Sequence, residues 1–308
     1  GAREAFLDTR WRGFRPGRIR FLGFEPDEDE ARKLSEQARA QNAHCEYFGV
    51  GLWSRPSIER FYATEAEGGS SFYPPNHALV NRWKFESATN VMLGEALFKV
   101  VRSPELRLDT VDRVLDGRRV DFMKLNVQGA ELEILRGAAA TLEGVLGIQT
   151  EVAFVESYVG RPMFSDIDSH LRALGFQFFD IVAPHYLGRA GPPITARQLP
   201  GLFGLYGQVV EAHALYLRDP IDLARRNPAW VASLTAGALL KLVAIAETYH
   251  QVEFAFELLE WSRGQLEARG ERAAAGQLAE VRRLGLKKYE AYMKWHSDHF
   301  DSLVPPSA

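Results

Sequence analysis

The sequence predicts an α/β fold built on a parallel sheet, and two stretches of the chain carry this prediction. Residues 120–127 form a short apolar run that ends at a turn containing Gly129. Apolar residues then recur at the spacing of one helix face, at Leu132, Leu135, Ala139 and Leu142. Strand, tight turn and amphipathic helix in this order form the unit of parallel sheets. Residues 19–24 and the helical pattern that follows them repeat this order.

Composition and charge exclude several classes of protein. The chain has 308 residues, 46% of them hydrophobic and 25% charged, with a net charge of -3. This balance gives no electrostatic reason to expect nucleic acid or an anionic membrane as a partner. No apolar run reaches the roughly 18 residues of a membrane span, so we expect no membrane insertion. Cys45 is the only cysteine, which excludes an intrachain disulfide and favours a cytoplasmic location.

The pattern divides the chain into two domains. Residues 1–219 read as the α/β domain, and residues 220–308 read as an all-helical C-terminal appendage. Apolar residues recur at helical spacing in residues 234–249, 254–266 and 278–295, which predicts three helices in the appendage. This part of the chain could cover the active site, form a homodimer or bind another partner, and the sequence does not choose among these roles.

Glu25 is the first candidate for a binding residue. It follows the apolar strand 19–24, and Pro26 comes next. A carboxylate at the tip of the second strand can accept hydrogen bonds from both hydroxyls of a ribose. Gly1 precedes Glu25 by a spacing close to the roughly 20 residues expected between the glycine turn and the ribose acid. The alternative is that Glu25 caps its strand in solvent.

The remaining elements of the predicted sheet follow from apolar runs and capping residues. We expect a third strand at residues 44–50, with Val50 and Gly51 packing near an adenine. Later strands are predicted at 147–154, at 176–182 and at 207–217, the last of them antiparallel at the sheet edge. Helix starts are expected at Asp27, with Glu30 in a capping box, at Asp109 and at Ser165, with Asp168 completing the box.

Polar residues gather where the central strands end. Lys124, Asn126, Gln128 and Glu131 stand at the carboxyl edge of the strand at 120–127, where ligands bind in open α/β sheets. Glu151 lies inside an apolar strand, which is costly unless the carboxylate is paired, so it is a site candidate. The alternative is a core carboxylate that pairs with Lys124 or an arginine. His185 follows the strand at 176–182 and could contact a substrate, with a loop or lid at 188–200.

The central motif also resembles a known family. MKLNVQGAE, residues 123–131, is similar to the "IKIDVEGAE" signature of FkbM-type S-adenosylmethionine-dependent methyltransferases, and "FEP" at residues 24–26 resembles their second motif. Gly1-Ala2-Arg3 resembles the middle of the family's glycine motif, with the first strand before it missing from this sequence. The resemblance spans roughly residues 1–219. It implies a Rossmann-like class I methyltransferase sheet, S-adenosylmethionine as cofactor, and methyl transfer to a hydroxyl of a small molecule, sugar or lipid-linked glycan. The implied cofactor-binding residues are Gly1, Glu25, Pro26, Val50, Gly51 and Asn126.

Departures from the family pattern shape the expected chemistry. Asn126 stands in place of an aspartate and Gln128 in place of a glutamate, and Glu4 stands where the family has glycine. Both amides keep hydrogen-bonding capacity but carry no charge, so Asn126 can hold a cofactor amine or a substrate hydroxyl but cannot act as a base. We therefore expect Glu151 to be the base, with His185 behind it. Lys124 would orient Glu151 or lower its pKa, and Gln128 and His185 would contact the acceptor. The missing carboxylates also make a metal-dependent mechanism less attractive.

Two other functions remain open from the sequence. The chain could be a binding or regulatory module that keeps the cofactor fold but has lost catalysis, as Glu4 and Asn126 suggest. It could also be a nicotinamide-dependent oxidoreductase, since Glu25 alone could hold the ribose of NAD. The signature around Asn126 argues against the oxidoreductase.

Overall fold

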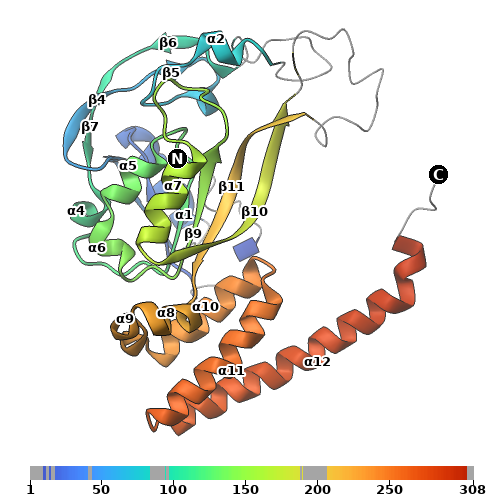
Figure 1. Cartoon of the computed structure of the whole chain (residues 1–308). Coiled ribbons are helices and arrows are strands. Elements are labelled where there is room, and N and C mark those ends of the chain that lie inside the picture. Colours follow the sequence, from blue (N-terminus) through green and yellow to red (C-terminus); the bar gives the residue numbers. More distant parts are fainter. Residues whose placement is uncertain are drawn as a thin grey trace. The chain divides into compact units, whose positions relative to one another are not determined.

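The computed structural model describes residues 10–11, 14, 18–40, 44–83, 94, 97–187, 189 and 207–303. The predicted loop at 188–200 therefore lies, apart from Arg189, outside the described residues, as do Gly1 and Glu4. The chain divides into two compact units, Gly1–Arg218 and Asp219–Ala308 (Figure 1). The first unit mixes strands and helices, which confirms the α/β class. Its described strands form four separate sheets.

The largest sheet has four strands in the order β10-β11-β9-β8. Their bounds are Phe122–Leu125 for β8, Gly147–Ala153 for β9, Phe176–Leu187 for β10 and Gln208–Arg218 for β11. β8 and β9 are parallel, and β11 runs antiparallel to both of its neighbours. Two predictions were wrong here. β11 lies inside the sheet and not at its edge, and β10 continues beyond residue 182 through His185.

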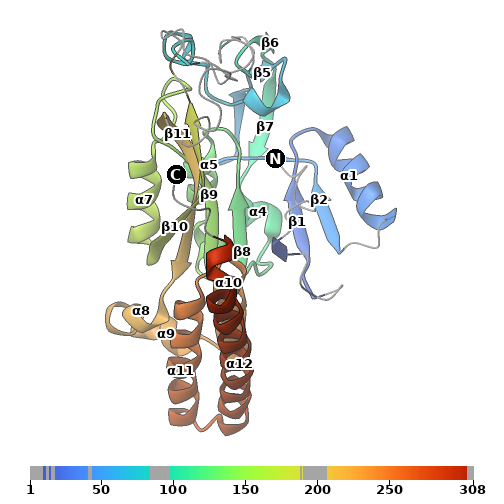
Figure 2. The ribbon, with the colours of Figure 1, turned by 90° about the vertical axis from the view of Figure 1, so that its right-hand side faces the viewer.

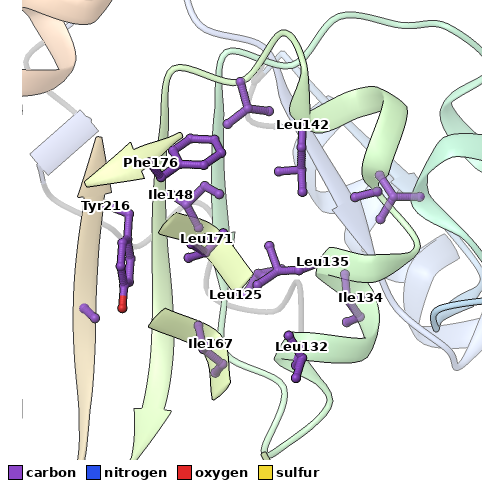
Figure 3. Packing of buried hydrophobic residues seen from close by; sticks show 14 of the residues in the cluster. Leu125, Leu132, Ile134, Leu135, Leu142, Ile148, Ile167, Leu171, Phe176 and Tyr216 are labelled. Carbon is purple, nitrogen blue, oxygen red and sulfur yellow. The ribbon is translucent and has the colours of Figure 1, made fainter. Parts of the chain in front are cut away.

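Helices α5 (Glu131–Arg136), α6 (Ala139–Leu142) and α7 (Phe164–Ala173) contribute to the core with this sheet. Figure 3 shows the packing, in which side chains of α5 and α7 lie among those of β8, β9 and β11. The buried residues labelled there include Leu125, Leu132, Leu135, Ile148, Leu171 and Tyr216. Removing these apolar side chains from water supplies most of the stability of such a core.

The single helix predicted after residue 130 is in fact two helices. The side chain of Asp112 accepts hydrogen bonds from the backbone N–H groups of Ala140 (2.9 Å) and Thr141 (2.8 Å), so it caps the start of α6. Gly137 lies between the two helices, where a Cβ atom would come within 2.1 Å of the Trp53 carbonyl oxygen. The close approach of this loop requires glycine and ends α5.

Two predicted caps were assigned to the wrong residue. At α7 the backbone N–H of Met163 donates to Asp166 (2.8 Å), whereas Asp168 pairs with Arg172. At α4 (Val111–Leu115) the capping side chain is Thr110 and not Asp109, because the Arg113 N–H donates to the Thr110 hydroxyl (3.2 Å). In both cases the residue predicted as the cap is polar and could accept a hydrogen bond, but it does not stand at the position that meets the N–H groups of the first turn.

The remaining strands form smaller sheets around the first. β1 (Phe21–Phe24) and β2 (Cys45–Phe48) are parallel, with α1 (Glu28–Ala40) packed beside them (Figure 2). The predicted cap of α1 is confirmed, since the Glu30 N–H donates to Asp27 at 3.0 Å. The other elements are β3 (Gly51–Leu52), β4 (Ser57–Arg60), β5 (Ala63–Thr64), the 3-10 turn Glu67–Gly69, α2 (His77–Val80), β6 (Val100–Arg102) and β7 (Glu105–Asp109). β7 pairs with β3 and β4, and β5 pairs with β6.

The second unit is helical throughout the part that the structure describes. It contains α8 (Pro220–Arg226), α9 (Pro228–Ser233), α10 (Ala236–Thr248), α11 (Val252–Ala268) and α12 (Arg272–Leu303). Asp219, Asn227 and Thr235 cap α8, α9 and α10 through their side chains. Leu242, Leu258 and Leu278 are fully buried among α10, α11 and α12. Within the described part of the chain, no helix has the length and apolar character needed to cross a bilayer.

Candidate functional site

A row of polar side chains crosses the four-stranded sheet near the carboxyl ends of β8 and β9. Glu151 of β9 pairs in register with His213 of β11, and His185 of β10 pairs with Glu211 of β11. Asn126 follows β8 directly, and its Nδ2 lies 3.4 Å from Nε2 of His213. Side chains two residues apart on a strand share a face, so Glu211 and His213 point to the same side of the sheet. The row therefore brings together residues from three strands and the residue that follows the fourth.

The turn between β8 and α5 is held in an unusual conformation. Gln128 has a φ of 54° and Gly129 a φ of 106°, both in the left-handed region. The carboxylate of Glu131, which is buried, accepts hydrogen bonds from the N–H groups of Val127 and Gly129, each at 2.8 Å. The hydroxyl of Ser71 donates to the backbone oxygen of Gln128 at 2.6 Å. The buried carboxylate of Glu131 thus stabilises the conformation of the turn through its two hydrogen bonds.

Gln128 links three parts of the site through its side-chain amide. Its Nε2 donates to Asn126 Oδ1 (3.1 Å) and to Glu151 Oε1 (3.3 Å). Its Oε1 lies 3.2 Å from the hydroxyl of Tyr158, whose one proton has a closer acceptor in the backbone oxygen of Gly69 at 2.9 Å. These contacts fix the amide orientation, with the nitrogen toward Asn126 and Glu151.

Glu151 forms a buried ion pair with an arginine. Arg161 Nη2 lies 3.6 Å from Glu151 Oε2, and Arg161 Nη1 donates to the hydroxyl of Ser157 at 2.8 Å. Burial raises the pKa of Glu151 well above its usual range, and the negative charges of Glu211 and Glu131 act in the same direction. Arg161 and the hydrogen bond from Gln128 oppose the rise without cancelling it. Glu151 therefore holds its proton to a higher pH than an exposed glutamate does.

The pKa of Glu211 shifts in the opposite direction to that of Glu151. Burial raises the pKa of Glu211, but the hydrogen bond to His185 and the positive charges of Arg161, His185 and His213 outweigh it, so the pKa is lowered. His185 Nδ1 lies 3.2 Å from Glu211 Oε1, and this hydrogen bond raises the pKa of His185 despite its partial burial. The pKa values of these two carboxylates near one guanidinium thus shift in opposite directions.

A cavity of about 80 Å³ borders this row. The polar residues that line it are Gln128, Ser157, Tyr158, His185 and Glu211. Its other walls are apolar and include Val80, Trp83, Phe98, Leu187 and Val210. The cavity combines an apolar interior with a few convergent polar groups, which is typical of small-molecule sites.

The structure brings several of the predicted site residues together. Asn126, Gln128 and Glu151 are joined by hydrogen bonds, and His185 lies next to Glu211 in the same row. Lys124 is exposed, and the ion pair of Glu151 is with Arg161, so the orienting role of Lys124 stays a prediction. The sequence left open whether a paired Glu151 would have Lys124 or an arginine as its partner, and the structure shows an arginine.

The predicted cofactor-binding residues are spread over other elements. Glu25 stands at the end of β1, where it is only 6% exposed, and Pro26 beside it is half-buried. Val50 is half-buried against the main core. Gly51 begins β3 and is not the turn after the third strand, and a Cβ atom there would meet Leu108 Cδ2 at 2.4 Å. This glycine is therefore packed closely against the side chain of Leu108.

Sequence reasoning missed most of the partners of Glu151. Glu211 and His213 alternate with apolar residues in β11, and from this spacing the sequence could have predicted that both side chains lie on one face of the sheet. Arg161 and Tyr158 lie in the segment between β9 and α7, and no sequence pattern marked them as buried. Among the described residues, no group of three or more His, Cys, Asp or Glu side chains is placed to hold a metal ion.

Comparison with known proteins assigns the family. Residues 1–178 match the methyltransferase FkbM domain, a span that includes Glu25, Asn126, Glu151 and Arg161. His185, Glu211 and His213 lie beyond the matched span. No curated protein and no solved structure shows significant similarity to the chain. The match covers more than half of the sequence, and the chain therefore belongs to the FkbM methyltransferase family.

Proposed function

We propose that this protein uses S-adenosylmethionine to methylate a hydroxyl oxygen. The observation that carries the proposal is the polar row Asn126–Glu151–His213, which continues to Glu211 and His185 and borders an apolar cavity. Ligands of open α/β sheets bind at the carboxyl ends of parallel strands, where this row lies. Membership of a methyltransferase family supplies the reaction class. The parallel pairs β1–β2 and β8–β9 are consistent with a Rossmann-like sheet.

Glu25 fits the binding of the cofactor ribose. It is a buried carboxylate at the carboxyl end of a parallel strand, where a ribose diol can donate hydrogen bonds to it. The backbone N–H of Asp27 lies 3.4 Å from its Oε1, which orients the carboxylate beyond the strand end. Asn126 would contact the methionine part, because it stands at the corresponding end of β8. Gly1 and Pro26 remain predicted contacts.

The bound cofactor would supply an electrophilic methyl group. The acceptor hydroxyl must lose its proton as its oxygen attacks, so a base within hydrogen-bond reach is required. His185 lines the cavity and Glu151 does not, which favours His185 over Glu151 for this role. With Nδ1 toward Glu211, the ring presents Nε2 as the proton acceptor. Glu151 and Arg161 then hold Gln128 and Glu211 in place and move no proton.

Calorimetric titration with S-adenosylmethionine, S-adenosylhomocysteine and NAD tests this function. We expect the two adenosyl compounds to bind and NAD not to bind. Glu25→Gln should weaken both adenosyl complexes by about tenfold or more, since a charged hydrogen bond is worth roughly 1.5–3 kcal/mol. Glu28→Gln, at an exposed position in the first turn of α1, is the matched control and should bind as the wild type does. Binding of NAD alone would remove the proposal.

A further inference from the structure

We propose that the cavity beside His185 is the acceptor subsite, and that it takes a small apolar alcohol carrying a second, hydrogen-bond-accepting oxygen rather than a sugar. The inference rests on the proposed methyl transfer, and it names the substrate class. The observations that carry it are the composition of the cavity walls, the size of the cavity, and one buried donor that has no described partner.

The walls favour an apolar ligand. Val80, Phe98, Leu187 and Val210 are buried side chains of one apolar cluster, and all four line the cavity. A sugar placed there would turn hydroxyl groups toward these carbon atoms, and each buried hydroxyl without a partner is costly. The polar residues of the lining are Gln128, Ser157, Tyr158, His185 and Glu211. A ligand with one hydroxyl on an apolar body matches this division.

The size limits the part of the ligand that enters. The cavity measures about 80 Å³. One water occupies about 30 Å³ of the liquid, and a cavity of about 150 Å³ holds benzene. The space therefore admits a short aliphatic arm, and the remainder of a ligand of about six heavy atoms must lie outside it.

Trp83 adds a second polar requirement. Its side chain is 1% exposed and lines the cavity, and its indole Nε1 has no hydrogen-bond partner among the described residues. Arg189 lies over the indole ring, 4.8 Å from the ring centroid, and fixes its plane. Buried tryptophan N–H groups usually have an acceptor. An ether or carbonyl oxygen on the ligand would supply one.

Three probes of equal size separate these features. 1-Pentanol, 3-methoxy-1-propanol and glycerol each have six heavy atoms but differ in their oxygens. Ligand-observed NMR should show binding of the first two at millimolar concentrations and no binding of glycerol. Trp83→Phe should lower the affinity of 3-methoxy-1-propanol relative to 1-pentanol about fivefold, the equivalent of one net hydrogen bond. Trp230→Phe, in the C-terminal unit, should leave this ratio unchanged.

A variant that fills the cavity tests whether the alcohols bind inside it. Val210→Phe should weaken both alcohols by tenfold or more, whereas Val101→Phe at an exposed position of β6 should have no effect. If Val210→Phe does not fold, as judged by its thermal unfolding, the comparison of the three probes on the wild type decides alone. Equal binding of glycerol and 1-pentanol overturns the proposal, and so does an affinity ratio that Trp83→Phe leaves unchanged.

Calorimetry with S-adenosylhomocysteine on the same samples distinguishes failure of the subsite from failure of the proposed function. Cofactor binding without any preference for the apolar alcohols removes the subsite and leaves methyl transfer standing. Alcohol binding without cofactor binding removes methyl transfer, and with it the description of the cavity as an acceptor subsite.

Discussion

Arg161 and Glu151 form an ion pair that is almost wholly buried, with side-chain exposures of 1% and 5% and 3.6 Å between Nη2 and Oε2. The same guanidinium lowers the pKa of Glu211, so one cation serves two carboxylates. Since Gln128 also donates to Glu151, the pair anchors the amide that reaches Asn126.

Removing the arginine should destabilise the fold strongly. Arg161→Met leaves the buried carboxylate of Glu151 without its cation, and breaking a buried pair in this way typically costs about 3–5 kcal/mol. Urea denaturation measures the free energy of unfolding. Arg172→Met is the control, because its pair with Asp168 is exposed on the arginine side and should contribute about 1 kcal/mol or less. Equal losses in the two variants would show that the buried pair contributes no more than a surface pair.

The protonation of Glu151 should appear in the pH dependence of stability. Its pKa is raised in the folded state, so its contribution is fully present below the unfolded pKa and is lost as the pH rises through the folded value. Glu151→Gln cannot ionise, and it should gain stability relative to the wild type from about pH 4.5 upward, by at most about 1.4 kcal/mol per pH unit. Unfolding curves of both proteins at several pH values measure this difference. A gap that closes as the pH rises contradicts a raised pKa.

Glu131 should be essential to the turn rather than to chemistry. Its carboxylate accepts two backbone hydrogen bonds inside the protein, so Glu131→Ala leaves the N–H groups of Val127 and Gly129 without this acceptor. We expect a loss of about 3 kcal/mol in the free energy of unfolding. Glu133→Ala on the same helix is the control and should cost about 1 kcal/mol or less, since its partner Arg136 is half-exposed. A smaller loss for Glu131→Ala than for Glu133→Ala would rule out this structural role.

The break between α5 and α6 can be tested with two glycines. A Cβ atom at Gly137 would lie 2.1 Å from the Trp53 carbonyl oxygen, whereas at Gly144 the nearest atom is 3.8 Å away. Gly137→Ala should therefore cost about 1–3 kcal/mol, because the backbone of residue 53 must move. Gly144→Ala should change stability by about 0.5 kcal/mol or less. Thermal unfolding of the two variants compares them, and similar midpoints would contradict the close approach.

The His185–Glu211 pair should govern a pH dependence of its own. Glu211→Gln removes the carboxylate that raises the pKa of His185, so that pKa should fall, which an NMR titration of the imidazole measures directly. If His185 is the base, methyl transfer rises with pH as the ring loses its proton, and in Glu211→Gln this rise occurs at lower pH. His185→Gln should lower kcat by about 10²–10⁴-fold. His44→Gln, at an exposed position, is the control. An imidazole pKa unaffected by Glu211→Gln would separate the two residues.

The parts of the fold that could be predicted are those set by local sequence. The cap at Asp27 follows from capping chemistry and the helix after it from helical spacing, and both are found. The strand and turn around Asn126 were predicted for the same reason. The break between α5 and α6 could not be predicted, because it depends on Asp112 and Trp53, which are distant in sequence.

The candidate site divides in the same way. Asn126, Gln128 and Glu151 could be predicted to meet, because they lie at the ends of two parallel neighbours. The contribution of Glu211 and His213 depends on β11 lying between β9 and β10, an order that apolar periodicity does not reveal. Arg161 comes from the segment after β9, and only the folded chain shows that its guanidinium is buried beside Glu151.

The most direct test of the account is a crystal structure with S-adenosylhomocysteine, in which the distances from the Glu25 carboxylate to the ribose hydroxyls are measured. We predict hydrogen bonds of about 2.6–3.0 Å to both hydroxyls, with the sulfur end beside Asn126 and facing the cavity at His185. A ribose distant from Glu25, or a sulfur atom with no open path to that cavity, would contradict the account.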